Sequence, residues 1–316
     1  CAGGAEERPA ALCSVGGFHP WINQFIDAAY KKKLNAQGYQ VGALEYRDLT
    51  AEKVKPFNVL LLQWAPNEGE SDGTAVYRSK IPVIEQFVRE GGGVLVTCEE
   101  AYANFKNVNQ LLQPFGAEIL KEGLDDPKSV YRQKSYLQWY FCSTANIDRE
   151  HPVGKGLKEI WYPMAHSLSE GSGTMPLRIK EAGAQGNEWR IVVRAADTAR
   201  SSKGTYGTAP PLLAARQFGK GRIVVFPTHT TYWINAGYHR IWEQICMEKG
   251  DGAKLLDNIY RWLAEPSLAS GACGGYTEAK EPPKPPKPTA TMPDPEPIIP
   301  NIVANTRNYS AKLQSD

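Results

Sequence analysis

A repeated alternation of short apolar runs with helix-like segments is the feature of this sequence that most restricts its fold. Apolar runs of strand length occupy residues 10–15, 41–46, 58–64 and 94–98. The run at 58–64 is apolar almost throughout, as expected of a strand that is covered on both faces. Strands that alternate with helices are joined by right-handed crossovers and form a parallel sheet. The sequence therefore predicts an α/β fold with a flavodoxin-like, doubly wound, mostly parallel sheet.

The first two predicted helices have defined faces and ends. Ile26, Ala29, Tyr30 and Leu34 share one face of the first helix, and Gly38 closes it because glycine tolerates a positive φ.

A later helix carries Ile81, Ile84, Phe87 and Val88 on one face and stops at the three glycines 91–93. Proline is tolerated best in the first turn of a helix, so we expect Pro82 to lie there.

The second half of the sequence has a different rhythm. Residues 121–190 are irregular and rich in Tyr and Trp, which predicts an inserted antiparallel section packed on the main sheet. Residues 212–216 and 222–226 flank a glycine turn and predict a hairpin. A last helix at 254–263 places four apolar residues on one face: Leu255, Ile259, Trp262 and Leu263.

The composition shifts after Pro266. Proline-rich sequence favours the polyproline II conformation and cannot build a helix or an inner strand. We therefore divide the chain into a leader at 1–8, an α/β domain at 9–265 with its insertion at 121–190, and an extended tail at 266–316. The tail is predicted to be a spacer, or a segment whose residues 280–300 bind a partner protein.

Charge and hydropathy exclude two classes of partner. Lys plus Arg total 36 against 34 Asp plus Glu, so the chain lacks the basic surplus that drives nucleic-acid binding. No run approaches the roughly 20 apolar residues that span a bilayer, so we predict no membrane span.

The cysteines bear on compartment and metal binding. Cys1 is followed by small residues and then by a polar stretch, which is how a mature bacterial lipoprotein begins, although a processing boundary at a cysteine gives the same start. We expect a secreted or cell-envelope protein with a lipid anchor at Cys1. The other cysteines are scattered without a CxxC pair or a Cys/His cluster, so we predict no metal site and no cofactor.

Three segments resemble the class I glutamine-amidotransferase-like superfamily, and within it the trehalose-utilisation (ThuA-like) branch. The first strand and its turn, residues 14–20, are similar to that branch in having a glycine turn followed by a histidine. Residues 151–162 resemble a His-Pro-x-x-x-Gly-Leu element with acidic and aromatic residues after it. Residues 219–229 resemble a Gly-Lys-Gly-Arg strand that leads to a histidine. In order and spacing these segments cover most of residues 9–265.

The resemblance implies a site at the carboxyl ends of the strands. Cys98 follows an apolar strand where catalytic members carry their nucleophile, and His229 ends a later strand near the position of the general base. Such a pair works because the imidazolium lowers the pKa of the thiol and the base later protonates the leaving group. The resemblance further implies that a ligand would contact five residues: Gly17, His19, Glu99, Glu100 and Trp233.

The sequence departs from the catalytic pattern around Cys98 and leaves enzymatic activity open. The glycines that flank the nucleophile are missing, and Glu99 and Glu100 disfavour a thiolate beside them. The leading hypothesis is a noncatalytic or weakly catalytic domain that binds a small polar ligand such as a carbohydrate. The alternatives are a cysteine hydrolase or amidotransferase that uses Cys98 and His229, and a structural envelope protein that docks a partner through its tail.

Overall fold

The computed structural model describes residues 10–17, 28–63, 65–66, 71–97, 105–128, 130–132, 140–164, 173–179, 188–228, 246–247 and 249–278. The chain divides into a unit at Cys1–Glu278, which holds all of these residues, and a unit at Ala279–Asp316. Most of the predicted functional residues lie outside the described residues: Cys1, His19, Cys98, Glu99, Glu100, His229, Trp233 and the tail segment 280–300.

The described part of the chain is built on a seven-stranded sheet. Its order is β11 (Arg190–Arg194), β13 (Pro211–Phe218), β14 (Gly221–Val225), β4 (Gly93–Val96), β3 (Val59–Leu62), β1 (Ala11–Gly16) and β2 (Gln40–Glu45). The five strands from β14 to β2 are parallel. At one edge of the sheet, β13 is antiparallel to β14, and β11 is antiparallel to β13. The predicted α/β fold with a mostly parallel sheet is confirmed.

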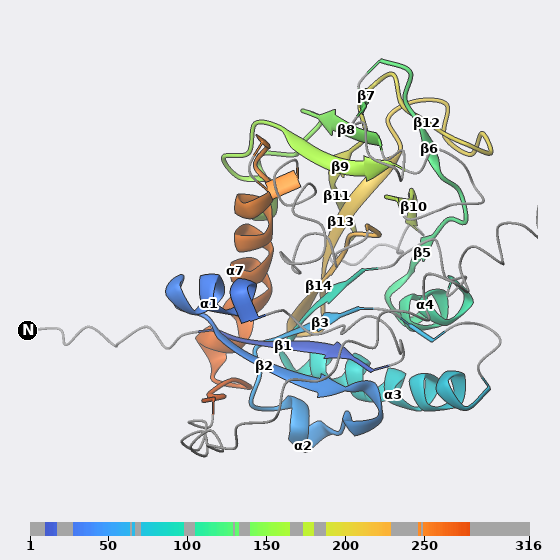
Figure 1. The fold of residues 1–316 in the computed structure, drawn as a ribbon. Coiled ribbons are helices and arrows are strands. Elements are labelled where there is room, and N and C mark those ends of the chain that lie inside the picture. The colour runs from blue at the N-terminus through green and yellow to red at the C-terminus, as the bar shows by residue number, and fades with distance from the viewer. Residues whose placement is uncertain are drawn as a thin grey trace, which may run out of the picture. The chain divides into compact units, whose positions relative to one another are not determined.

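Helices cover both faces of this sheet (Figure 1). The helices α1 (Ala28–Ala36) and α7 (Gly252–Ser270) pack on one face, and α2 (Ala51–Val54), α3 (Ser71–Glu90) and α4 (Phe105–Leu112) pack on the other. Successive side chains of a strand point to opposite faces. Leu61 and Leu95 therefore join the core under α7, and Leu60 and Val94 join the core under α3. Among the described residues, no helix combines the length and the apolar character that a membrane span requires.

The remaining strands are short and antiparallel. They are β5 (Ala117–Ile119) with β10 (Leu177–Ile179), β6 (Leu124–Asp125) with β12 (Arg200–Ser201), and the sheet of β7 (Val130–Arg132), β8 (Tyr140–Thr144) and β9 (Ile160–Met164). Single 3-10 turns occur at η1 (Tyr46–Asp48), η3 (Gln113–Phe115) and η4 (Pro152–Gly154). The start of β9 lies beside the first turn of α7, where Asp251 N–H donates to the carbonyl oxygen of Glu159 at 2.9 Å.

Two details of the predicted helices are wrong. The helix that carries Pro82 begins at Ser71, so this proline lies inside α3 rather than in its first turn. Pro82 and Arg78 are both exposed, and water can therefore replace the donor that Pro82 removes from the carbonyl of Arg78. In α1, Tyr30 and Leu34 are buried as predicted, but Ala29 is exposed. The packed stripe of this short helix is narrower than its apolar pattern indicated.

The last helix extends further than the sequence indicated, because α7 continues through Pro266 to Ser270. Proline has no N–H, so the carbonyl of Trp262, four residues earlier, lacks its helical donor. The guanidinium of Arg222 supplies a replacement, since its Nη1 donates to the Trp262 carbonyl oxygen at 2.6 Å. A side chain from β14 thus lets the helix pass through a proline.

The predicted hairpin is confirmed, and its glycine turn packs closely against another element. β13 and β14 are antiparallel and joined at Gly219–Lys220. A Cβ atom on Gly221 would lie 2.1 Å from the carbonyl oxygen of Gly92, so only glycine fits between the hairpin and the end of α3. Lys220 N–H also donates to the Arg89 carbonyl at 3.0 Å. The Gly-Lys-Gly-Arg segment therefore fixes the hairpin to α3 through its glycines and to α7 through Arg222.

Candidate functional site

A row of buried polar side chains crosses the sheet at the carboxyl ends of four neighbouring parallel strands. The residues are Thr228 after β14, Thr97 after β4, Gln63 after β3 and Ser14 near the end of β1. They are 0%, 5%, 2% and 0% exposed, respectively. We call these four residues the polar row.

Three members of the polar row belong to one face of the sheet. Each stands two positions after an apolar residue of the core under α7, and these partners are Leu12, Leu61, Leu95 and Phe226. Because side chains alternate with a period of two along a strand, Ser14, Gln63 and Thr97 lie on the same face as their apolar partners, whereas Thr228 follows Phe226 after a turn in which its N–H donates to the Phe226 carbonyl at 2.7 Å. This face therefore changes from apolar to polar at the carboxyl edge, where doubly wound sheets bind their ligands.

Hydrogen bonds join the polar row to the strand ends, but one acceptor of the row has no donor among the described residues. Gln63 Nε2 lies 3.4 Å from Ser14 Oγ, and Thr97 Oγ1 donates to the carbonyl oxygen of Leu62 at 3.1 Å. The hydroxyl of Thr228 lies 2.8 Å from that of Thr174. The Oε1 atom of Gln63 is buried and accepts no hydrogen bond from any residue that the structure describes. A buried amide oxygen without a donor costs about 1–3 kcal/mol, so this atom is a candidate ligand contact.

The row includes the point where the strand order reverses. The chain goes from β1 outward to β2 and returns to β3 on the other side of β1. Gly17, which the sequence predicted as a ligand contact, follows β1 at this point with φ +109°. A Cβ atom there would lie 3.2 Å from the side chain of Glu45, so the backbone passes close to β2. Tyr46 OH donates to the Gln63 carbonyl at 3.0 Å and closes this corner of the sheet.

The strands that precede Cys98 and His229 are neighbours. Val96 of β4 is paired in register with Val225 of β14, and Phe226 N–H donates to the Val96 carbonyl at 2.9 Å. Cys98 comes directly after Thr97 in the sequence, and His229 comes directly after Thr228. The chain thus leaves the described strands toward both residues from adjacent members of the polar row. The roles of Cys98 and His229 stay predictions.

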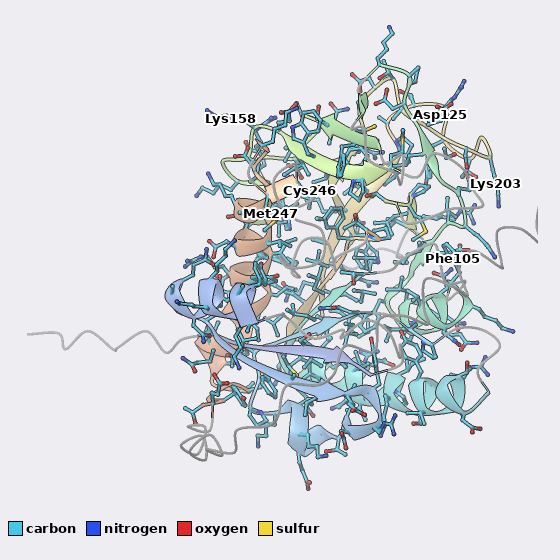
Figure 2. The ribbon with its side chains drawn as sticks, in the orientation of Figure 1. Phe105, Asp125, Lys158, Lys203, Cys246 and Met247 are labelled. Atoms are coloured by element: carbon cyan, nitrogen blue, oxygen red, sulfur yellow. The ribbon has the colours of Figure 1, made fainter. Side chains whose placement is uncertain are left out.

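A second buried amide lies at the start of α4. Asn107 is 1% exposed, and its Nδ2 donates to the Pro66 carbonyl at 2.8 Å and to Thr74 Oγ1 at 3.1 Å. A carbonyl oxygen can only accept, so the group that faces Pro66 is the amide nitrogen and Oδ1 points elsewhere. That oxygen has no donor among the described residues. Figure 2 labels Phe105 at the start of this helix. The loop after β3 therefore has a second unused acceptor beside it.

The described cysteines are packing residues. Cys13, Cys142 and Cys246 are buried without a disulfide, and burial raises the pKa of each thiol well above its usual range. Figure 2 shows Cys246 near the amino end of α7. Cys273 is partly exposed, and its pKa is also raised by burial. Thiols that resist ionisation are poor nucleophiles.

His151 caps the start of η4. Its Nδ1 accepts a hydrogen bond from Val153 N–H at 3.2 Å at the start of η4, and its ring packs edge-on against Trp262 at 4.9 Å. Burial, followed by the nearby Arg190 guanidinium, lowers the pKa of His151 to about 4. Side chains of α7 hold the same loop, since Asn258 Nδ2 donates to the Val153 carbonyl at 3.0 Å. The His-Pro-x-x-x-Gly-Leu element thus has a structural role, because it fixes the η4 loop to α7.

The part of the chain that the structure describes contains no group of three His, Cys, Asp or Glu side chains that could hold a metal ion. His19, Glu99, Glu100 and His229 lie outside it. The donor set near the polar row consists of hydroxyl and amide groups, which suits hydrogen bonding to a neutral molecule.

Comparisons with known proteins give the fold. No family model and no curated protein sequence matches the chain. Among solved structures, the mmIFT52 N-terminal domain is 15% identical with a TM-score of 0.53, and the match covers 81% of this chain and 97% of that one. A ThuA-like protein from Bacteroides uniformis is 15% identical with a TM-score of 0.47, over 81% and 91%. Cytoplasmic protein STM1381 from Salmonella typhimurium is 16% identical with a TM-score of 0.45, over 80% and 99%.

At these low sequence identities, the similarity to the solved structures concerns the fold alone. A ThuA-like protein, from the branch that the sequence motifs resemble, is among the structural neighbours. The polar row was not identified from the sequence. Its signal was present, because a polar residue follows an apolar one at a spacing of two near the end of each of these strands, but each occurrence alone is unremarkable among strand ends.

Proposed function

We propose that this protein is a noncatalytic or weakly catalytic domain of amidotransferase-like fold that binds a small polar ligand, in particular a carbohydrate. The ligand lies at the carboxyl edge of the parallel strands. The observation that carries the proposal is the polar row with its unused Gln63 oxygen at the reversal of strand order. Gly17, His19, Glu99, Glu100 and Trp233 are the further residues that we propose to contact the ligand.

The chemistry of the described edge favours a neutral ligand with several donors. Ser14, Gln63, Thr97 and Thr228 carry no charge, so they offer neither an ion pair nor a strong field to an anion. The amide oxygens of Gln63 and Asn107 require donors, and sugar hydroxyls donate as well as accept. A saccharide would therefore supply donors to two oxygens that lack one among the described residues.

Replacing Gln63 with methionine separates ligand binding from stability. Methionine has a similar length and removes the buried oxygen, so we expect the free energy of unfolding to be unchanged or to rise by about 1 kcal/mol. The affinity for the saccharide should fall at least tenfold, because its hydroxyl loses an acceptor. The measurement is titration calorimetry of the full chain with glucose, galactose and trehalose, together with urea unfolding of each protein.

Gln217→Met is the matched control, because Gln217 is an exposed glutamine of β13 away from the polar row. It should leave both binding and stability within error. Equal affinities in Gln63→Met and Gln217→Met would remove the polar row from the binding site. A failure of all three sugars to bind the unaltered chain would overturn the carbohydrate proposal itself.

The pairing of β4 with β14 favours one alternative, a cysteine hydrolase that uses Cys98 and His229. The two strands that lead to these residues are adjacent and in register, as a nucleophile and its base require. The missing glycines around Cys98 and the neighbouring Glu99 and Glu100 oppose this alternative.

The pH dependence of Cys98 alkylation, read by peptide mass spectrometry, distinguishes the two functions. For a binding domain we expect Cys98 to label with a midpoint near the ordinary thiol pKa of about 8.5 or above, with the same profile in His229→Ala. Cys273 is the suitable internal reference because it is partly exposed, whereas Cys142 and Cys246 are buried. Rapid labelling of Cys98 at pH 6 that disappears in His229→Ala would instead establish an activated thiolate.

A further inference from the structure

A polar hollow lies on the edge strand β11, with β13 between it and β14. Its volume is about 450 Å³. The residues that matter for its chemistry are Asn146, Asp148, Arg149, Arg194 and Asp197.

The floor of this hollow is held by the backbone. The segment at 146–148 lies antiparallel to β11, with Ile147 bridged to Val193. Asp148 N–H donates to the Val192 carbonyl at 2.8 Å, and Arg194 N–H donates to the Asn146 carbonyl at 3.0 Å. These bonds hold Asn146 and Asp148 beside Arg194 of the edge strand.

Two guanidinium groups line the hollow without a carboxylate partner among the described residues. Carbonyl oxygens orient Arg149, whose Nε donates to Leu157 at 2.8 Å and whose Nη2 donates to Lys158 at 3.1 Å. Arg194 Nη1 lies 3.4 Å from the Ala209 carbonyl oxygen. A guanidinium that is held by neutral carbonyls keeps its full charge and loses little conformational entropy when it binds an anion.

Two other exposed arginines, Arg200 and Arg178, are paired with carboxylates. Arg200 pairs with Asp125 at 2.6 Å, and Arg178 pairs with Glu118 at 3.2 Å. At the hollow itself, Asp148 is already paired with Arg190, which lies outside the lining. The charges left to a ligand are thus Arg149 and Arg194 against Asp197, a surplus of one positive charge.

We propose that this hollow binds an oxyanion, a carboxylate or a phosphate, carried by a hydroxylated small molecule such as a sugar acid or a sugar phosphate. The planar guanidinium of Arg194 matches the paired oxygens of either anion, and Arg149, whose Nε and Nη2 already donate to carbonyl oxygens, adds its charge and its Nη1 donors. Asp197 accepts a hydrogen bond from Asn146 Nδ2 through Oδ1 at 2.9 Å and retains Oδ2 as an acceptor for a ligand hydroxyl. The site is separate from the polar row and does not depend on the function proposed there.

The test is titration calorimetry of the full chain at low ionic strength with glucuronate, glucose 6-phosphate and glucose. We expect saturable binding of at least one of the two anions, and at least tenfold weaker binding of that anion by Arg194→Gln. Arg200→Gln, which removes an exposed arginine elsewhere, should bind as the unaltered chain does. Arg194 is chosen because Arg149 also holds the loop through its carbonyl contacts.

The pattern of binding identifies the source of the oxyanion. Binding of glucuronate alone would indicate a carboxylate ligand, and binding of glucose 6-phosphate alone would indicate a phosphate ligand. Comparable binding of both would indicate a site that selects only for charge. Each of these three results supports the proposal if Arg194→Gln weakens the binding. Absence of saturable binding by either anion, or equal weakening in Arg194→Gln and Arg200→Gln, would overturn it. Binding that is lost in Gln63→Met and kept in Arg194→Gln belongs to the polar row and also counts against the hollow.

Discussion

Replacing Arg222 with methionine is expected to lower the free energy of unfolding by about 2–3 kcal/mol, as measured by urea denaturation of the full chain. The substitution removes the donor to the Trp262 carbonyl inside α7, at 2.6 Å, and the cation that lies 4.8 Å from the centre of the Trp262 ring. Methionine keeps the aliphatic packing, so the loss reports these polar interactions together with the ion pair between Arg222 and Glu265 at 2.5 Å. Arg200→Met removes an exposed ion pair and should cost less than about 0.5 kcal/mol.

A second substitution tests why Arg222 matters. Pro266→Ala restores a backbone N–H that can donate to the Trp262 carbonyl within the helix. In the Pro266→Ala background, Arg222→Met should therefore cost about 1 kcal/mol less than in the unaltered chain. Equal costs in the two backgrounds would show that Arg222 stabilises α7 by another route.

Arg222 and Pro266 also show how much of the secondary structure the local sequence can predict. The strands were predicted correctly because a strand buried on both faces must be apolar along its length, as residues 59–62 and 93–96 are. The position of Pro266 inside a helix could not be predicted, because its compensating donor, Arg222, comes from a hairpin 44 positions earlier, the difference of the two residue numbers. Local propensity is weak where a distant side chain supplies the missing hydrogen bond.

The candidate site divides in the same way. Gly17 and the strand ends that lead to Cys98 and His229 were predicted from motifs, because a parallel sheet necessarily brings its carboxyl ends to one edge. That Gln63 is buried with an unused oxygen depends on which neighbours face it, namely Ser14 and Tyr46, and those contacts arise from strand order rather than from spacing. The hollow at β11 was not predicted, since it requires the segment at 146–148 to lie beside the edge strand.

His151 is expected to make the protein lose stability as the pH falls from about 6.5 to about 4. Its pKa is lowered to about 4 by burial and by Arg190, with Arg222 adding to the effect and Asp148 opposing it. The unfolded chain binds this proton with an ordinary pKa of about 6.5, so the contribution is complete above pH 6.5 and is lost as the pH falls toward 4. The loss amounts to at most about 3 kcal/mol. Urea unfolding at several pH values measures it.

His151→Asn should flatten this pH dependence. The side-chain oxygen of asparagine can accept from Val153 N–H at the start of η4, but the side chain does not titrate. At pH 7.5 the variant should be about 1 kcal/mol less stable than the unaltered chain because it loses the packing on Trp262, and near pH 4 the order should reverse. The control Asp251→Asn removes a carboxyl whose pKa is lowered by hydrogen bonds from Lys158 and Glu159 N–H. Its effect on the slope belongs below about pH 4.

The contacts of His151 and Arg222 with Trp262 couple the titration of His151 to Arg222. Trp262 contacts both side chains, with Arg222 over its ring and His151 edge-on to it, and the positive charge of Arg222 helps to lower the pKa of His151. Arg222→Met should therefore raise that pKa toward its ordinary value and reduce the stability lost between pH 6.5 and 4. A slope that is the same with and without Arg222 would assign the lowered pKa to burial and Arg190 alone.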